Sequence, residues 1–322
     1  MRSALDLAVI GAGAMGRNHI RVAMGHRDVR VAFVVDIEPE QGQDAASKAG
    51  AAYLKDVEGL IGNVDAAVVA VPTPEHVSVA SLLLENGIAT LVEKPLASSP
   101  SEARKLVDVS DHSGTLLMVG HVERFNPAIL ALPSVLSEPI HFELTRVSPF
   151  TPRVVDGVIM DLMIHDLDIL QSLVTAPIAS VQAISQTVRS RSHDLAVALL
   201  MFANGATAIL TASRLGQEKV RSLTITQPDN VVRVDLIRQD ITVHSQQRVS
   251  FDEKGSGFTS SGMVESPFIP NRGEPLALEL DHFVSCIVNA GKPTVTGEDG
   301  VRAIELALQV EACANGTENG TG

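Results

Sequence analysis

The first 120 residues alternate short apolar runs with segments whose apolar positions recur every three or four residues. The apolar runs are nearly continuous, as in parallel strands that helices cover on both faces. Because crossovers between parallel strands are right-handed, this pattern predicts a doubly wound α/β sheet with its ligand at the carboxyl ends of the strands. The expected strands are 5–10, 29–35, 65–71, 89–93 and 115–119.

The pattern changes after about residue 125. Strand-like runs now follow one another through short, turn-like connections such as 203–205 and 228–230, which favour antiparallel neighbours. They predict an α+β domain built on a mostly antiparallel open sheet. The expected strands are 140–147, 179–188, 194–202, 206–213, 219–226, 230–237 and 240–245, and the expected helices are 158–173, 275–290 and 298–313.

A glycine motif follows the first expected strand, where the chain reads G-A-G-A-M-G before a helix-like segment. In this context the first glycine makes a tight turn, the second lets the backbone approach a pyrophosphate, and the third lets helix and strand pack closely. The helix N-terminus favours the phosphate charge. We expect a dinucleotide to contact Gly11, Gly13, Ala14, Met15 and Gly16.

Asp36 ends the second expected strand, 20 residues after Gly16. This is the usual place for a carboxylate that accepts hydrogen bonds from the adenosine ribose hydroxyls. A carboxylate also repels a 2′-phosphate, and residues 37–40 carry no Arg or Lys to neutralise one. The sequence therefore favours NAD over NADP. The alternative for Asp36 is a helix cap or turn residue.

Polar residues follow several strands of the predicted parallel sheet. Because these strand ends meet in one crevice, the residues there are expected to lie along the cofactor. They are Val71, Pro72, Thr73, His76, Glu93, Lys94 and His121.

Lys94 follows a strand end and precedes Pro95, which restricts the local backbone. An ammonium beside the nicotinamide could hydrogen-bond a substrate hydroxyl or the developing carbonyl oxygen. The alternative is an ordinary strand-end lysine paired with Glu93.

Asp161 and His165 are four residues apart in an expected helix, so they share a face that Asp168 continues. A carboxylate bonded to an imidazole fixes the tautomer and raises the basicity that a general base requires. A zinc site is disfavoured because further Cys or His ligands at close spacing are missing, and no metal is expected. The remaining alternative is a surface helix with a capping Asp and a solvated His.

Arg124 and Asn126 lie at the expected domain junction. Both could contact substrate, or they could merely cap the next helix at a hinge. From these patterns we expect a dinucleotide-binding Rossmann domain over 1–122, a substrate-binding and oligomerisation domain over 123–314, and a disordered tail over 315–322. The glycine- and serine-rich segment 254–262 is expected to be a mobile surface loop.

The amino-acid composition excludes some classes of binding partner. The formal net charge of −13 argues against nucleic acid or an anionic membrane surface. No apolar run reaches 18 residues, so no membrane span is expected, and no signal peptide precedes the first strand. Two cysteines are too few for a disulfide framework and suit a reducing cytoplasm. The large sheet has few helices to cover it, so a homo-oligomer is expected to bury its exposed face.

Together, the glycine motif, the E-K-P at 93–95 and the D-x-x-x-H at 161–165 resemble the Gfo/Idh/MocA (glucose–fructose oxidoreductase/inositol dehydrogenase/MocA) family. The resemblance runs from the first strand to about Ala312 and implies a homodimer or homotetramer formed through the antiparallel sheet. By the family pattern, Lys94, Asp161 and His165 form the catalytic set and contact the substrate. Which of Lys94 and His165 takes the hydroxyl proton stays open.

The sequence departs from the family at two points, which make the pocket floor bulkier. Met163 stands where many members have the glycine of D-x-G-x-H, and Val158 and Ile159 stand where many have glycines just before it. The stretches 119–127 and 148–168 look most like a branch that oxidises nucleotide sugars such as UDP-N-acetylglucosamine at the 3-position. That resemblance implies that Arg153 or Arg124 neutralises a diphosphate. The alternatives are an inositol or free-sugar dehydrogenase, a glycoside hydrolase that recycles NAD, and a catalytically idle NAD sensor.

Overall fold

The structure is a computed structural model that describes residues 4–151, 156–245, 248–251, 258–269 and 272–318. The chain forms two compact units, each made from two stretches of sequence. The first unit contains Met1–Phe125 and Gly273–Glu305, and the second contains Asn126–Arg272 and Leu306–Gly322.

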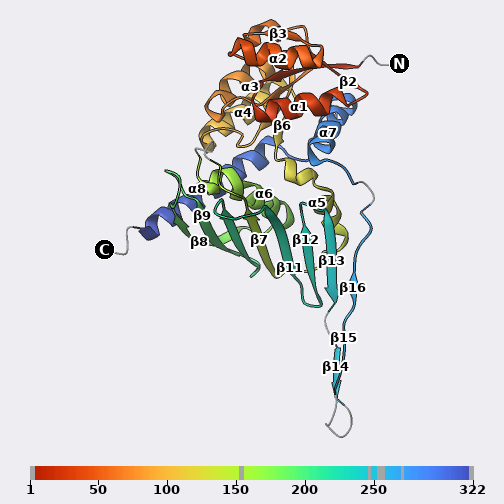
Figure 1. The fold of residues 1–322 in the computed structure, drawn as a ribbon, viewed down its shortest axis with the longest axis vertical. Helices are drawn as coiled ribbons and strands as arrows, with labels where there is room; N and C mark the ends of the chain where they lie inside the picture. The colour runs from red at the N-terminus through yellow and green to blue at the C-terminus, as the bar shows by residue number, and fades with distance from the viewer. Residues whose placement is uncertain (1–3, 152–155, 246–247, 252–257, 270–271, 319–322) are drawn as a thin grey trace. The chain divides into compact units, whose positions relative to one another are not determined.

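The first unit is built on a six-stranded parallel sheet with helices packed around it (Figure 1). Its strand order, β3-β2-β1-β4-β5-β6, is the doubly wound order of dinucleotide-binding domains. The predicted parallel sheet is therefore confirmed, although the short strand β3 was not predicted. The strands are β1 Leu5–Ile10, β2 Val29–Val35, β3 Ala52–Leu54, β4 Ala66–Val69, β5 Ala89–Glu93 and β6 Leu117–Gly120.

The helices of the first unit follow the strands in alternation. Strands β1, β4, β5 and β6 are buried almost throughout, because helices cover both faces of the sheet. The helices are α1 Ala14–Met24, α2 Pro39–Ala49, η1 Val57–Leu60, η2 Thr73–Glu75, α3 His76–Glu85, α4 Pro100–Ser113, η3 Val122–Phe125 and α7 Pro275–Asn289.

The structure divides the chain differently from the expected boundary between residues 122 and 123. Helix α7 packs against α1 and η3 of the first unit, where the rings of Phe125 and His282 lie 5.4 Å apart. The apolar face of α7 was visible in the sequence, but the pattern does not say which sheet that face covers. Helix α8 (Gly297–Glu318) contributes residues to both units, and it makes 315–318, which were expected in the disordered tail, helical.

The second unit contains an eight-stranded sheet in the order β16-β13-β12-β11-β7-β10-β9-β8. Only β7 and β10 pair in parallel among its described strands, so the expected mostly antiparallel sheet is confirmed. Its strands are β7 His141–Val147, β8 Ile178–Gln186, β9 Leu195–Phe202, β10 Thr207–Ser213, β11 Val220–Thr226, β12 Asn230–Asp235, β13 Asp240–Ser245 and β16 Val264–Glu265.

Short helices and a separate two-stranded ribbon complete the second unit. The strand β15 (Phe258–Ser261) pairs with β14 (Arg248–Phe251), so part of the segment expected to be a loop over 254–262 is a strand. The helices are α5 Pro127–Ala131, η4 Leu132–Ser134, η5 Ile159–Met163 and α6 Ile164–Leu173.

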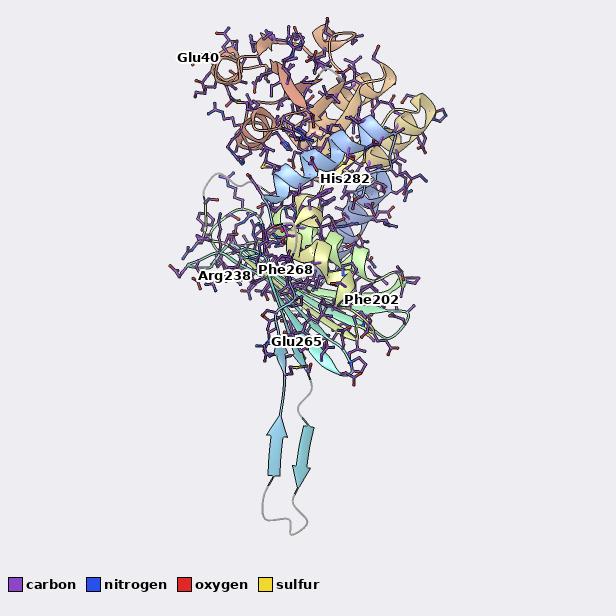
Figure 2. The ribbon with its side chains drawn as sticks, turned by 90° about the vertical axis from the view of Figure 1, so that its right-hand side faces the viewer. Glu40, Phe202, Arg238, Glu265, Phe268 and His282 are labelled. Carbon is purple, nitrogen blue, oxygen red and sulfur yellow. The ribbon has the colours of Figure 1, made fainter. Side chains whose placement is uncertain are left out.

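Alternate residues of the large sheet face a buried core. On β9, Leu200 and Phe202 are buried, whereas their neighbours Leu199 and Met201 are exposed (Phe202 is labelled in Figure 2). This period of two is the expected signature of a sheet with one covered face. Among the described residues, no helix combines the length and the apolar character that crossing a bilayer requires.

Candidate active site

The glycine turn between β1 and α1 has the shape that a dinucleotide requires. Gly11 has φ of +91°, and a Cβ at Gly16 would lie only 1.7 Å from the carbonyl oxygen of Gly11. At Gly13, by contrast, a Cβ would meet no atom within 4 Å. The turn is therefore tight where strand and helix pack, and its backbone is open where a pyrophosphate would approach.

Asp36 joins the end of β2 to this turn. Its Oδ2 accepts the backbone N–H of Ala12 over 2.6 Å and the side-chain amide of Gln41 over 3.0 Å, and its Oδ1 accepts the N–H of Glu38 over 2.8 Å. Asp36 thus has the turn-forming role that the sequence left open as an alternative. An ionised carboxylate has about four acceptor positions, so it retains capacity for a ribose hydroxyl.

His76 holds together the loops that follow β4 and β5. Its Nδ1 lies 3.0 Å from the carbonyl oxygen of Pro95, and its Nε2 lies 3.0 Å from that of Val71. Burial lowers the pKa of His76, and the neutral ring finds an acceptor for either tautomer. His76 is 1% exposed, so we now expect it to fix the cofactor-facing loop that carries Val71, Pro72 and Thr73.

Glu93, also expected beside the cofactor, directs its carboxylate into the first unit. Its Oε1 lies 2.7 Å from Nε2 of His19 on α1, and its Oε2 accepts the backbone N–H of Lys94 over 3.3 Å. The Lys94 side chain is half-buried. Glu93 therefore holds the backbone of Lys94.

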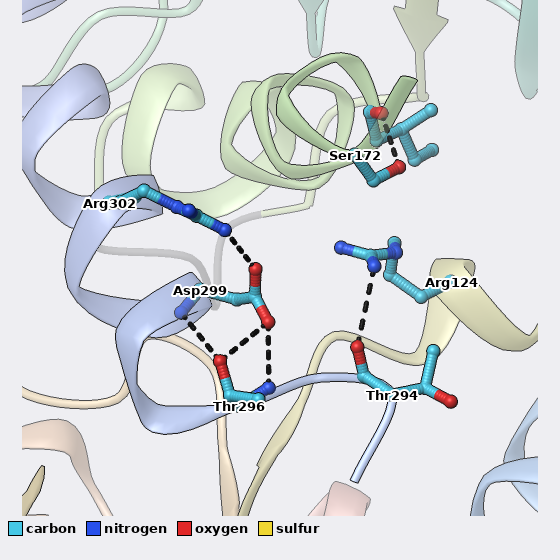
Figure 3. A network of polar contacts seen from close by, with 7 residues as sticks. Arg124, Ser172, Thr294, Thr296, Asp299 and Arg302 are labelled. Atoms are coloured by element: carbon cyan, nitrogen blue, oxygen red, sulfur yellow. Dashed lines mark hydrogen bonds and ion pairs between the residues drawn. The ribbon is translucent and has the colours of Figure 1, made fainter. Parts of the chain in front are cut away.

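Arg124 and His121 follow the end of β6. His121 is 1% exposed, and Arg124 donates from Nη2 to the carbonyl oxygen of Thr294 over 3.4 Å (Figure 3). At the start of α8, the Thr296 hydroxyl donates to Oδ2 of Asp299 over 2.7 Å, and Arg302 pairs with the other carboxylate oxygen.

The carboxylate of Asp299 connects this network to Arg124. Burial alone would raise the pKa of Asp299, but the N–H and hydroxyl of Thr296, together with the charges of Arg124 and Arg302, lower it. Arg124 thus has an ionised carboxylate nearby that balances part of its charge. No local pattern in the sequence indicates this partner, because Asp299 lies 175 positions along the chain from Arg124.

Asn126 is a helix cap in the structure. Its Oδ1 accepts the N–H of Ala128 in the first turn of α5 over 3.1 Å, and its amide donates to the carbonyl oxygen of Leu236 over 2.9 Å. Asn126 is 1% exposed. These contacts support the capping alternative over the expected contact with substrate.

Asp161 and His165 lie where α6 begins. Residues Ile159–Met163 form a π-helical turn, a wider turn that is frequent at functional sites, and α6 continues from Ile164. Both Asp161 and His165 are half-buried. His165 is therefore not the fully solvated histidine of the alternative.

Arg214, which the sequence analysis missed, holds Asp161. Its Nη2 donates to Oδ2 of Asp161 over 3.1 Å, and its Nη1 donates to the carbonyl oxygen of Asp156 over 2.7 Å. The Arg214 side chain is 3% exposed, so this ion pair is shielded from water on one side. The available signal was a charged residue directly after a predicted strand that ends at 213.

Two other carboxylates of α6 are buried. Asp166 receives the guanidinium of Arg146 on β7, with 2.7 Å between Nη2 and Oδ1, and Asp168 is 2% exposed. Asp166 therefore holds α6 against the sheet.

The described residues contain no cluster of His, Cys, Asp and Glu that could hold a metal ion. Arg153, the other expected diphosphate ligand, lies outside the described residues.

Comparisons with known proteins agree with these features. A family model described as an oxidoreductase family with an NAD-binding Rossmann fold matches residues 5–121, and a GFO/IDH/MocA C-terminal domain matches residues 140–228. The UDP-N-acetylglucosamine 3-dehydrogenase of Acidithiobacillus ferrooxidans is 30% identical over 306 residues, or 94% of this chain and 95% of that protein. The chain belongs to the Gfo/Idh/MocA family of oxidoreductases.

Further members of the Gfo/Idh/MocA family match over a similar length. A solved structure of the Acidithiobacillus ferrooxidans enzyme superposes with a TM-score of 0.89 at 28% identity, covering 98% of this chain and 99% of that one. The inositol 2-dehydrogenase of Rhizobium meliloti is 24% identical over 318 residues, which is 93% of each chain. The expected family, oxidoreductase class and NAD cofactor are thereby confirmed.

The residues of the first unit fit NAD. The open backbone at Gly13 and the N-terminus of α1 would hold the pyrophosphate, and Asp36 would hold the adenosine ribose. Val71, Pro72 and Thr73 would line the cofactor after β4. Lys94 follows β5, the next strand of the same sheet.

Proposed function

We propose that this chain oxidises a secondary hydroxyl of a nucleotide sugar to a ketone, with UDP-N-acetylglucosamine at its 3-position as the leading candidate. The observation that carries this proposal is the 30% identity to a UDP-N-acetylglucosamine 3-dehydrogenase over 94% of the chain. The sequence stretches 119–127 and 148–168, which resemble the nucleotide-sugar branch, support it.

In the proposed reaction the hydroxyl loses a proton to the protein and its carbon loses a hydride. Bound NAD supplies the hydride acceptor at C4 of the nicotinamide. Lys94 and His165 would act on the same hydroxyl, one taking the proton while the other stabilises the emerging carbonyl oxygen. Asp161, held by Arg214, would orient His165. The oxidation balances as one C–H and one O–H bond broken, one C=O bond formed and one proton released.

The diphosphate of a nucleotide sugar needs cations, and we propose Arg153 or Arg124 for this role. Arg153→Ala should raise the KM for the nucleotide sugar much more than the KM for the free sugar. An equal effect on both KM values would reject Arg153 as a diphosphate ligand.

We also propose that the chain forms a homodimer or homotetramer through the large sheet of the second unit. Four apolar side chains on the solvent-facing side of three adjacent strands support this: Ile184 on β8, Leu199 and Met201 on β9, and Ile209 on β10. Contiguous apolar surface of this kind is typical of an interface. Light scattering of Leu199→Lys/Met201→Lys against the wild type would measure the oligomeric state.

Inositol or free-sugar oxidation is the second candidate, because the inositol 2-dehydrogenase of Rhizobium meliloti is 24% identical over 93% of this chain. Hydrolysis of a glycoside with recycled NAD is the third candidate.

A cytoplasmic location, expected from two cysteines that are both free thiols, belongs to the same proposal.

The experiment that tests the function incubates the enzyme and NAD with UDP-N-acetylglucosamine, other nucleotide sugars, free sugars and inositols. Accumulation of reduced nicotinamide only with nucleotide sugars supports the first candidate, and accumulation only with inositol or free sugars supports the second. Aglycone release without reduced nicotinamide supports the hydrolase.

Variants at the catalytic set complete this test. Lys94→Ala and His165→Ala should each lower turnover by orders of magnitude while NAD affinity barely changes. Near-normal turnover in either variant would contradict the assignment.

A further inference from the structure

A buried carboxyl on α7 has no partner in the part of the chain that the structure describes. Glu279 is 0% exposed, and neither of its carboxyl oxygens has a hydrogen-bond partner there. An ionised carboxylate in this position would carry a large desolvation cost, so the neutral, protonated form is favoured. Glu279 lies on the same buried face of α7 as Leu276, Leu280 and Phe283. The spacing of these four residues is typical of the buried stripe of a helix.

The protonation of Glu279 depends on burial and on the charge of Glu93. Burial, and then the negative charge of Glu93, raise the pKa of Glu279 well above its usual range. A negative charge near a buried carboxyl adds to the cost of ionising it. Glu93 accepts the N–H of Lys94 and faces a ring nitrogen of His19, whereas neither carboxyl oxygen of Glu279 meets a donor among the described residues, so we assign the proton to Glu279.

Three elements of the first unit meet at Glu93. His19 comes from α1, the helix that starts at the glycine turn, and its Nε2 lies 2.7 Å from Oε1 of Glu93. Gly120 at the end of β6 leaves space for the Glu93 carboxylate, because a Cβ at Gly120 would lie 3.3 Å from Oε2 of Glu93. The same Oε2 accepts the backbone N–H of Lys94.

We propose that His19 and Glu279 are positioning residues for Lys94 that act through Glu93. His19 fixes one oxygen of the Glu93 carboxylate, which leaves the other to hold the Lys94 backbone. Protonated Glu279 adds no negative charge beside Glu93, whereas ionised Glu279 would repel a Glu93 carboxylate from that position. The proposal rests on the catalytic role of Lys94 in the proposed function, and it connects the helix of the dinucleotide turn to that lysine.

Other titratable groups lie on the elements around Glu279. Helices α1 and η3 pack against α7, and His282 lies on α7 itself (Figure 2). At the exposed edge of the α1–α7 contact, one pair joins Arg21 to Glu274 and another joins His26 to Asp281. The groups on η3 are Glu123 and Arg124.

The kinetic test compares two variants of His19. His19→Leu leaves an oxygen of Glu93 buried without a donor, so kcat should fall by roughly tenfold or more while NAD affinity changes little. His19→Gln offers an amide donor and should recover most of this loss. The control is His26→Leu, which removes the contact between a histidine just after α1 and the exposed carboxylate of Asp281 on α7 and should keep the wild-type kcat. An unchanged kcat in a folded His19→Leu variant would overturn the role of His19.

The second test follows the proton of Glu279 through stability and needs no substrate. A carboxyl whose folded pKa is raised loses its stabilising effect as the pH rises from the unfolded pKa towards the folded one. The ratio of the unfolding constants of wild type and Glu279→Gln should therefore rise by up to about tenfold per pH unit above roughly pH 4.5. Glu274→Gln, an exposed residue at the start of the same helix, should show no such trend. A ratio that stays constant up to neutral pH would overturn the protonated Glu279.

The two tests separate this proposal from the proposed function. If the wild type oxidises no sugar, the proposed function fails, and the acetylation rate of Lys94 by acetic anhydride, measured by peptide mass spectrometry, replaces kcat. His19→Leu should change that rate and His19→Gln should restore it. Equal rates in all three proteins would overturn the coupling of Lys94 to His19.

Discussion

Arg214 donates from Nη2 to Oδ2 of Asp161 over 3.1 Å, and the Arg214 side chain is almost completely buried. The pair joins the end of β10 to the π-helical turn before α6. Asp161 therefore does not depend on its own helix for its orientation. If Asp161 in turn orients His165, Arg214 belongs to the machinery of the active site although it need not touch the substrate.

We expect Arg214→Ala to lower kcat without weakening NAD binding. A hydrogen bond to a charged group contributes about 1.5–3 kcal/mol, so kcat should fall by roughly tenfold to a hundredfold. Steady-state kinetics and calorimetric NAD titration measure the two effects. Arg238→Ala, which removes an exposed arginine from an ion pair with Asp235, is the matched control and should leave both unchanged. A wild-type kcat in Arg214→Ala would show that Asp161 needs no external anchor.

Gly13 and Gly16 should respond differently to the same added methyl group. Gly13 has φ of −67° and open space around its Cβ position, so Gly13→Ala should fold normally and weaken NAD binding by roughly tenfold or more, because the methyl group occupies the approach of the pyrophosphate. Gly16→Ala places its Cβ 1.7 Å from the carbonyl oxygen of Gly11 and should lower the free energy of unfolding by about 1–3 kcal/mol or more.

Urea unfolding and calorimetric NAD titration distinguish these two glycines. The expected pattern is lost affinity without lost stability at Gly13, and lost stability at Gly16. Wild-type NAD affinity in Gly13→Ala would place the pyrophosphate elsewhere.

These glycines could be predicted from the sequence, whereas the role of Arg214 could not. The glycine motif and the parallel strands were predictable because their signals are local: an apolar run, a turn and a helix within about 20 residues. The same alternation of strand-like and helix-like segments predicted the fold class. Strand β3 was missed since it has only three residues.

The partners of the site residues were not predictable because they are distant in sequence. Arg214 lies 53 positions from Asp161, and Glu279 lies 186 positions from Glu93. A single sequence shows that Glu279 falls on the apolar side of a helix, but it does not show which carboxyl that side meets. The role of Asn126 was ambiguous for a related reason, since a cap and a ligand use the same amide.

Asp36 should discriminate between the two nicotinamide cofactors. Asp36→Ala removes a charged acceptor for the ribose, so NAD affinity should fall by about 1.5–3 kcal/mol. It also removes the charge that repels a 2′-phosphate, so the ratio of NADP to NAD affinity should rise. Asp36→Asn separates the effects, because the amide can still accept the N–H of Ala12 but carries no charge.

Calorimetric titration with both cofactors measures these changes. Asp44→Ala is the control, since Asp44 is an exposed carboxylate on the neighbouring helix α2 that pairs with Lys48. An unchanged NADP to NAD ratio in both Asp36 variants would mean that another residue selects the cofactor.

Asp194 should make the stability of the protein depend on pH in the acid range. Its Oδ2 accepts the backbone N–H groups of Val188, Arg189 and Ser190 over 2.6–3.0 Å, and the residue is 0% exposed. Burial alone would raise the pKa of Asp194, but the N–H groups of Arg189, Ser190 and Val188 together lower it well below its usual range. A carboxyl with a lowered folded pKa stabilises the protein above its unfolded pKa, and this stabilisation is lost as the pH falls towards the folded pKa.

The free energy of unfolding of Asp194→Asn should therefore lie below that of the wild type at neutral pH, by about 1.5–3 kcal/mol for the lost charged hydrogen bonds. The difference should shrink as the pH falls below about 4, since the unfolded wild-type carboxyl then binds a proton while the folded one keeps its charge. Urea unfolding from pH 7 to roughly pH 3 measures both curves. Asp229→Asn, in the exposed turn between β11 and β12, should follow the wild type throughout. Parallel curves for wild type and Asp194→Asn across this range would mean that the three N–H groups do not depend on an ionised partner.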